Sequence, residues 1–112
     1  MIDLRLYMIQ RITAMLMAPF VLVHLAVMII AIQGGLSAAE ILSRTQGSLL
    51  WTLFYGGFVV AAGIHGAIGV RVVLYEWAGL TGRRLGMAGW TIGCLLIALG
   101  LRAVWAVTWG SA

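Results

Sequence analysis

The sequence predicts an all-α membrane protein with three transmembrane helices, and three observations support this fold class. Of the 112 residues, 63% are hydrophobic and only 9% are charged, whereas a soluble domain carries about 25% charged residues. The mean hydropathy is +1.10. Three apolar stretches also reach the roughly 20 residues that a helix needs to cross a bilayer. Since no soluble core of this size covers so much apolar surface, lipid is expected to cover it.

The predicted spans lie at about residues 12–32, 49–74 and 87–107. The first span is not expected to be a secretory signal, because its apolar run is too long and no small-residue cleavage site follows it. The rest of the chain is a short N-terminal arm and two loops. Residues 1–112 are therefore predicted to form a single transmembrane domain.

The two loops differ in character. In the first, Ser37 is followed three residues later by Glu40, which is the capping-box pattern of a helix start. It predicts a short interfacial helix over about residues 37–44. The second loop, residues 75–86, is basic and contains glycines, which suits contact with a soluble partner or with anionic lipid.

The arginines predict how the chain is oriented in the membrane. If the chain crosses three times, five arginines share one side and two lie on the other. By the positive-inside rule, the N-terminus and the second loop are expected in the cytoplasm. The net charge of +4 then needs no nucleic-acid partner to explain it. The five are Arg5, Arg11, Arg71, Arg83 and Arg84, and the two are Arg44 and Arg102.

His24 and His65 are the two histidines of the chain, and both lie inside predicted spans. An ionisable side chain in the membrane is costly and points to function, and imidazole is a usual axial ligand of haem iron. Glycines 63, 66 and 69 recur near His65. They leave room either for a flat macrocycle or for a neighbouring helix. His65 is accordingly either a haem ligand or a histidine that is hydrogen-bonded across a helix interface.

His24 follows Pro19, which is expected to kink the first helix, and the same two interpretations apply to it. The two rings are predicted to lie at different depths. At about 1.5 Å per residue, His65 is about 9 Å from Arg71, while His24 is about 20 Å from Arg11. One chain is therefore not expected to hold both faces of one iron, and a sixth ligand would come from another subunit.

Four side chains near the cytoplasmic rim could bind a quinone headgroup through hydroxyl, guanidinium or indole donors. The alternative is an ordinary set of interfacial arginine and aromatic anchors. These residues are Arg11 and Thr13 in the first helix and Tyr75 and Trp77 at the end of the second.

Two short motifs resemble a known family. The segment from His65 through Gly69 to Arg71, with Glu76 eleven residues after the histidine, resembles the HxxxGxR…D signature of the cytochrome b membrane-anchor subunits of succinate dehydrogenase. The stretch QRITA around Arg11 resembles the R-(I/V/A)-(S/T)-(G/A) opening of the same subunits. The order and spacing of both motifs in a three-helix chain are the stronger signal.

The resemblance implies a membrane anchor for a flavoprotein subunit with FAD and a subunit with iron–sulfur clusters, in a bacterial cytoplasmic membrane. Electrons from succinate would pass through these partners to a quinone. His65 matches an axial ligand of haem b, the other ligand coming from a second membrane-anchor subunit that completes the haem-binding helix bundle. Arg11 matches the arginine near the quinone and the haem propionates, and Gly69 is the glycine of the signature.

The sequence departs from the family pattern at several positions, and two of these departures bear on cofactor and quinone binding. Trp77 stands where one paralogous anchor has a quinone-binding tyrosine, and many members with one haem lack a histidine at His24, so a second haem is an open possibility. Two other functions also fit the composition. One is a cofactor-free structural or accessory membrane subunit, and the other is a haem b subunit of another quinone-linked oxidoreductase.

Overall fold

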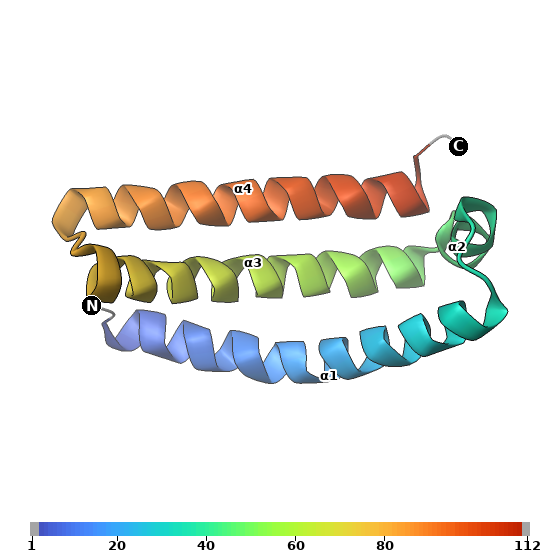
Figure 1. Ribbon diagram of the computed structural model, residues 1–112, viewed down its shortest axis with the longest axis horizontal. Helices are drawn as coiled ribbons and strands as arrows, with labels where there is room; N and C mark the ends of the chain where they lie inside the picture. The colour runs from blue at the N-terminus through green and yellow to red at the C-terminus, as the bar shows by residue number, and fades with distance from the viewer. Residues whose placement is uncertain (1–2, 111–112) are drawn as a thin grey trace.

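The computed structural model describes residues 3–110, which form four α-helices (Figure 1). Three of them are long and apolar enough to cross a membrane, and the described residues contain no strand. The predicted fold class is therefore confirmed. The helices are α1 (Leu4–Gly34), α2 (Ala38–Thr45), α3 (Leu49–Ala78) and α4 (Gly82–Thr108).

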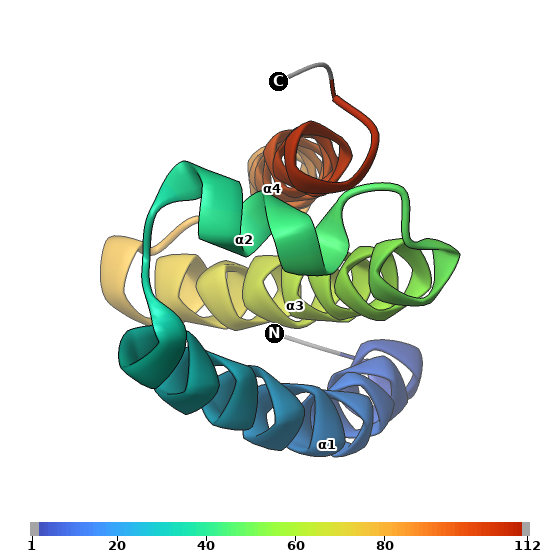
Figure 2. The ribbon, with the colours of Figure 1, turned by 90° about the vertical axis from the view of Figure 1, so that its right-hand side faces the viewer.

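The three long helices run antiparallel to their neighbours, and α3 lies between α1 and α4 (Figures 1 and 2). Helix α1 is bowed along its length in Figure 1, and Pro19 lies inside it. The start of α1 and the α3–α4 connection share one end of the bundle, and α2 lies at the other end. This arrangement agrees with the grouping of arginines predicted from the sequence, because Arg5, Arg83 and Arg84 all lie at the end that holds the start of α1 and the α3–α4 connection.

The long helices extend beyond the apolar spans by one or more turns. Helix α1 begins eight residues before the predicted span, where an Asp3 carboxylate oxygen accepts a hydrogen bond from the Leu6 N–H at 2.9 Å. The prediction of a loop over residues 75–86 was wrong, because only residues 79–81 separate α3 from α4. Gly79 ends α3 in the left-handed region, with φ of 69°. Hydropathy marks the apolar part of a helix, whereas capping residues decide where its hydrogen bonds stop.

The short helix α2 confirms the predicted capping box. Ser37 Oγ accepts a hydrogen bond from the Glu40 N–H, and the Glu40 carboxylate accepts one from the Ser37 N–H, both at 3.2 Å. The helix and the turn after it also cover the end of α4. Thr45 Oγ1 donates to the Val107 carbonyl at 2.6 Å, and the Gly47 N–H donates to the Thr108 carbonyl at 2.6 Å. These carbonyls have no partner within their own helix, so α2 satisfies the end of α4.

Glycines allow α3 and α4 to approach closely. A Cβ atom at Gly63 would lie 2.5 Å from Ile97 Cγ1, and one at Gly66 would lie 3.5 Å from Leu96 Cδ1. Of the two interpretations that the sequence left open for these glycines, helix packing is therefore correct for Gly63 and Gly66. Gly69 differs, because a Cβ atom there would lie 3.7 Å from Gln10 Nε2 in α1.

Candidate functional site

The His65 ring lies at the interface between α1 and α3. Its Nδ1 atom is 3.2 Å from Thr13 Oγ1 and 3.3 Å from the Gln10 carbonyl oxygen. Thr13 is 5% exposed, and its hydroxyl is 2.8 Å from the Ile9 carbonyl and 3.0 Å from that of Gln10. The structure thus joins two predicted site residues, Thr13 and His65, from opposite parts of the chain.

This network assigns the tautomer of His65. The single hydroxyl proton of Thr13 goes to a backbone carbonyl, so its oxygen is free to accept. The Gln10 carbonyl also only accepts. Nδ1 of His65 is therefore the nitrogen that carries the donated proton, and in the neutral ring this tautomer leaves the lone pair on Nε2. Nε2 makes no hydrogen bond within residues 3–110, which leaves it available to a ligand from outside.

A shallow, open groove lies beside His65, with a volume of about 450 Å³. Two of its lining residues, Ala14 and Ala18, are small and lie one turn apart on α1. The other walls are aliphatic or thioether side chains, so the groove suits an apolar group better than a polar one. The remaining lining residues are Met17, Val21 and Leu22.

His24 has different neighbours. Its ring meets Tyr55 and Phe58 edge-on, with centroid separations of 6.1 and 5.6 Å. Phe58 in turn stacks on Phe20 at 5.6 Å. No hydrogen bond of the His24 ring is found within residues 3–110. His24 therefore belongs to an aromatic cluster between α1 and α3, completed by Trp51 and Phe54.

The two histidines lie at different levels of the bundle. The α3 residues that contact His24 precede His65 by seven and ten positions, which is about 10–15 Å along the helix. The two rings therefore do not face one common ligand atom within this chain.

The structure does not bring the other predicted site residues together. Arg11 is exposed, and its guanidinium contacts Tyr7, with Nη1 3.3 Å from the hydroxyl. Two positions along a helix turn a side chain by about 200°, so Arg11 and Thr13 lie on different sides of α1. Tyr75 is 38% exposed and Trp77 is 85% exposed. Neither the groove beside His65 nor the cavity lined by Arg71 contains any of these rim residues.

The described residues contain no group of three or more histidine, cysteine, aspartate or glutamate side chains that could hold a metal ion. A haem ligand, by contrast, can be a single histidine from one chain. The Nε2 atom of His65 has no hydrogen-bond partner in residues 3–110 and could serve as such a ligand.

Residues 2–104 match a family model described as the succinate dehydrogenase/fumarate reductase transmembrane subunit. The chain belongs to this family. The match covers α1, α2, α3 and most of α4, and it confirms the resemblance noted from the two motifs. Comparisons with curated proteins and with solved structures find no significant match.

As a succinate dehydrogenase/fumarate reductase transmembrane subunit, the chain is an integral membrane subunit of a multi-subunit enzyme complex. Within this subunit, sequence reasoning missed three residues around His65. They are Gln10, whose backbone carbonyl contacts His65 Nδ1 together with Thr13, and the groove residues Ala14 and Ala18. The QRITA motif already contained Gln10, Thr13 and Ala14, but the sequence does not show which face of α1 meets α3.

Proposed function

We propose that this chain is a haem b-carrying membrane anchor of a succinate:quinone oxidoreductase. Family membership supports the anchor role. The observation that supports haem binding is His65, whose Nδ1 contacts Thr13 and Gln10 and whose ring lines a groove that includes the small residues Ala14 and Ala18. Metal-ligating histidines typically donate their other N–H to such a partner, which fixes the ring.

His65 Nε2 is the atom that would hold the haem iron, and Ala14 and Ala18 would leave space for one face of the macrocycle. When bound, the haem supplies one-electron chemistry. Thr13 and Gln10 hold the imidazole plane and strengthen its basicity by accepting the Nδ1 proton's hydrogen bond. Because the groove is open and His24 is on another level, the second axial ligand would come from a second membrane-anchor subunit.

The basic end of the bundle would face the cytoplasm. The iron–sulfur subunit and the flavoprotein subunit, with its FAD, would dock there. The exposed Arg11, Tyr75 and Trp77 at this end carry donors for a quinone headgroup, and Thr13 would take part only through a shift of α1. Because these residues are dispersed on this chain, the partner subunits would complete the quinone site. A bacterial cytoplasmic membrane is the proposed location.

We further propose a single haem. His24 is surrounded by aromatic rings that already pack against it, so its role is assigned to packing. A second haem would require ligands from outside this chain, whereas the exposed Arg11 could itself contact a haem propionate.

The test is to tag the chain in its native host and purify it in mild detergent. We expect a flavoprotein and an iron–sulfur protein to co-purify, with a b-type absorption spectrum that succinate reduces. A colourless complex would contradict haem binding but leave the anchor role intact. A chain that purifies alone and colourless would contradict both, and would favour a cofactor-free accessory subunit.

A further inference from the structure

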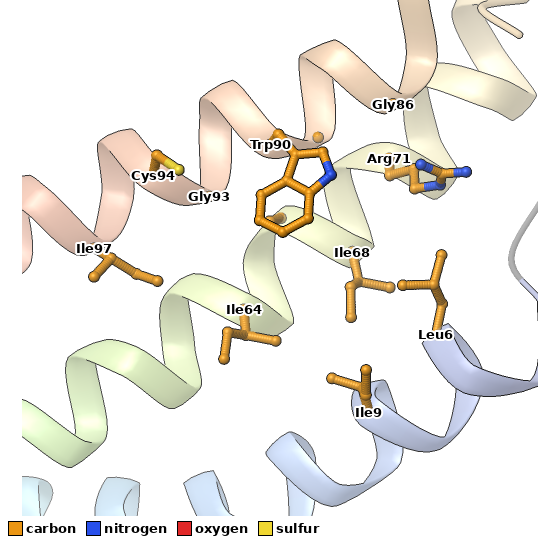
Figure 3. A pocket seen from close by; sticks show the side chains of 12 residues that line it. Leu6, Ile9, Ile64, Ile68, Arg71, Gly86, Trp90, Gly93, Cys94 and Ile97 are labelled. Atoms are coloured by element: carbon orange, nitrogen blue, oxygen red, sulfur yellow. The ribbon is translucent and has the colours of Figure 1, made fainter. Parts of the chain in front are cut away.

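A second cavity, distinct from the groove beside His65, lies where α1, α3 and α4 meet (Figure 3). Its volume is about 480 Å³, and its walls are mostly aliphatic. The Arg71 side chain lies at one end of it, and Cys94 and Ile97 lie at the other, as Figure 3 shows. Trp90 projects over it between these ends. It is thus an apolar cavity with a single positive charge at one end.

Arg71 has no anionic partner within residues 3–110. Its Nε atom is buried and makes no hydrogen bond within the described residues. The three carboxylates are placed elsewhere. Asp3 caps α1, Glu40 lies in α2 at the opposite end, and Glu76 is turned by about 140° around α3 from Arg71. A guanidinium beside apolar walls is costly unless an anion pairs with it.

The dimensions of the cavity fit one leaflet of a bilayer. Along α4 it extends from Gly86 to Ile97, which is about 16 Å at 1.5 Å per residue. The hydrocarbon core of a bilayer is about 30 Å thick, so the cavity spans about half of it. Its charged end is also the basic end of the bundle, where Arg83 and Arg84 are exposed and where tryptophans such as Trp90 favour the headgroup level.

We propose that this cavity is a binding site for an anionic phospholipid. The phosphate pairs with the Arg71 guanidinium, whose fork geometry matches phosphate oxygens, and one acyl chain lies along the aliphatic walls toward Ile97. Gly86 and Gly89 line the cavity beside Arg71, where Cβ atoms would lie in ordinary contact with its side chain, at 4.0 and 3.9 Å. The nearby Arg83 and Arg84 favour a headgroup with net negative charge over a zwitterionic one.

The test uses the intact complex in nanodiscs of phosphatidylcholine with a minor fraction of phosphatidylglycerol, followed by native mass spectrometry of the released complex. We expect the wild type to retain phosphatidylglycerol in preference to phosphatidylcholine. Arg71→Gln should retain about tenfold less, since it loses a charge-assisted hydrogen bond. Arg102→Gln is the matched control, because this exposed arginine is at the opposite end of the bundle, and it should retain as much as the wild type.

A second variant tests the acyl part without changing charge. Cys94 is exposed and lines the apolar half of the cavity, so Cys94→Trp should fill that half and also reduce retained phosphatidylglycerol severalfold. Equal retention by the wild type, Arg71→Gln and Cys94→Trp would overturn the proposal. A wild-type complex that retains no phospholipid would overturn it as well, as expected if a protein partner covers the cavity. Haem content, measured in parallel, reports separately on the proposed function.

Discussion

The two histidines lie in the same bundle and between the same two helices, yet their surroundings are opposite. His65 has two polar neighbours on Nδ1, at 3.2 and 3.3 Å, and an apolar groove beside it. His24 has aromatic rings at 5.6 and 6.1 Å. A ring held through one nitrogen presents the other in a fixed direction, whereas edge-on aromatic contacts fill space without fixing a nitrogen. The neighbours, rather than the residue type, distinguish a ligand from a packing residue.

The largest expected effect is that of His65→Ala. It removes the proposed iron ligand, so the b-type spectrum of the purified complex should be lost or strongly shifted. Exogenous imidazole should partly restore the spectrum by occupying the space left by the ring. An unchanged spectrum in His65→Ala would remove the basis for the contrast between the two histidines.

A large effect of another kind is expected in the aromatic cluster. Phe58→Ala removes the ring that stacks on Phe20 and meets His24, and it should cost about 2 kcal/mol of stability. Thermal unfolding of the complex measures this loss, and the position of the haem absorption bands should not change. A band shift in Phe58→Ala would mean that the cluster belongs to a cofactor site.

A smaller effect is expected for Thr13→Val, which keeps the shape and removes the hydroxyl beside His65 Nδ1. Without this hydrogen bond the imidazole donates less electron density to the iron. The oxidised haem is then less stabilised, so the reduction potential of the haem should rise. The change is at most about 40 mV, because one hydrogen bond is worth about 1 kcal/mol, which is about 43 mV for a one-electron couple, and the Gln10 carbonyl remains. Redox titration measures it. Thr13→Ser, which restores the hydroxyl, should return the potential to that of the wild type, and a variant pair with equal potentials would exclude the positioning role.

The smallest effect is expected for His24→Phe. A phenyl ring makes the same edge contacts with Tyr55 and Phe58, so the unfolding temperature should stay close to that of the wild type. The matched comparison is His24→Ala, which leaves a cavity and should lower it. If both variants destabilised the complex equally, the imidazole nitrogens rather than the ring volume would matter at this position.

Much of the fold follows from the sequence, because its causes are local or collective. Apolar length specifies the three spans, and the pattern of Ser37 and Glu40 specifies α2. The depth of His65 and its separation from His24 follow from the helix rise alone. The structure adds the positions at which the helices end, which depend on capping at residues such as Asp3 and Gly79.

The site itself was less predictable, because it depends on which helix faces meet. Glycines 63, 66 and 69 look like one stripe, but each step of three residues turns by about 300°. The stripe therefore drifts around α3, so that Gly63 and Gly66 meet α4 whereas Gly69 meets α1. Thr13 was predicted at the rim as a quinone donor, and its contact with His65 became visible only once α1 was placed against α3. Its role toward a quinone stays a prediction.

The central claim, that one iron is held through His65 and none through His24, is tested most directly by the ratio of haem to flavin in the purified complex. The pyridine haemochrome assay gives this ratio for the wild type, His24→Phe and His65→Ala. We predict one haem per flavin in the wild type and in His24→Phe, and almost none in His65→Ala. Two haems per flavin in the wild type that fall to one in His24→Phe would contradict the account and make His24 a ligand.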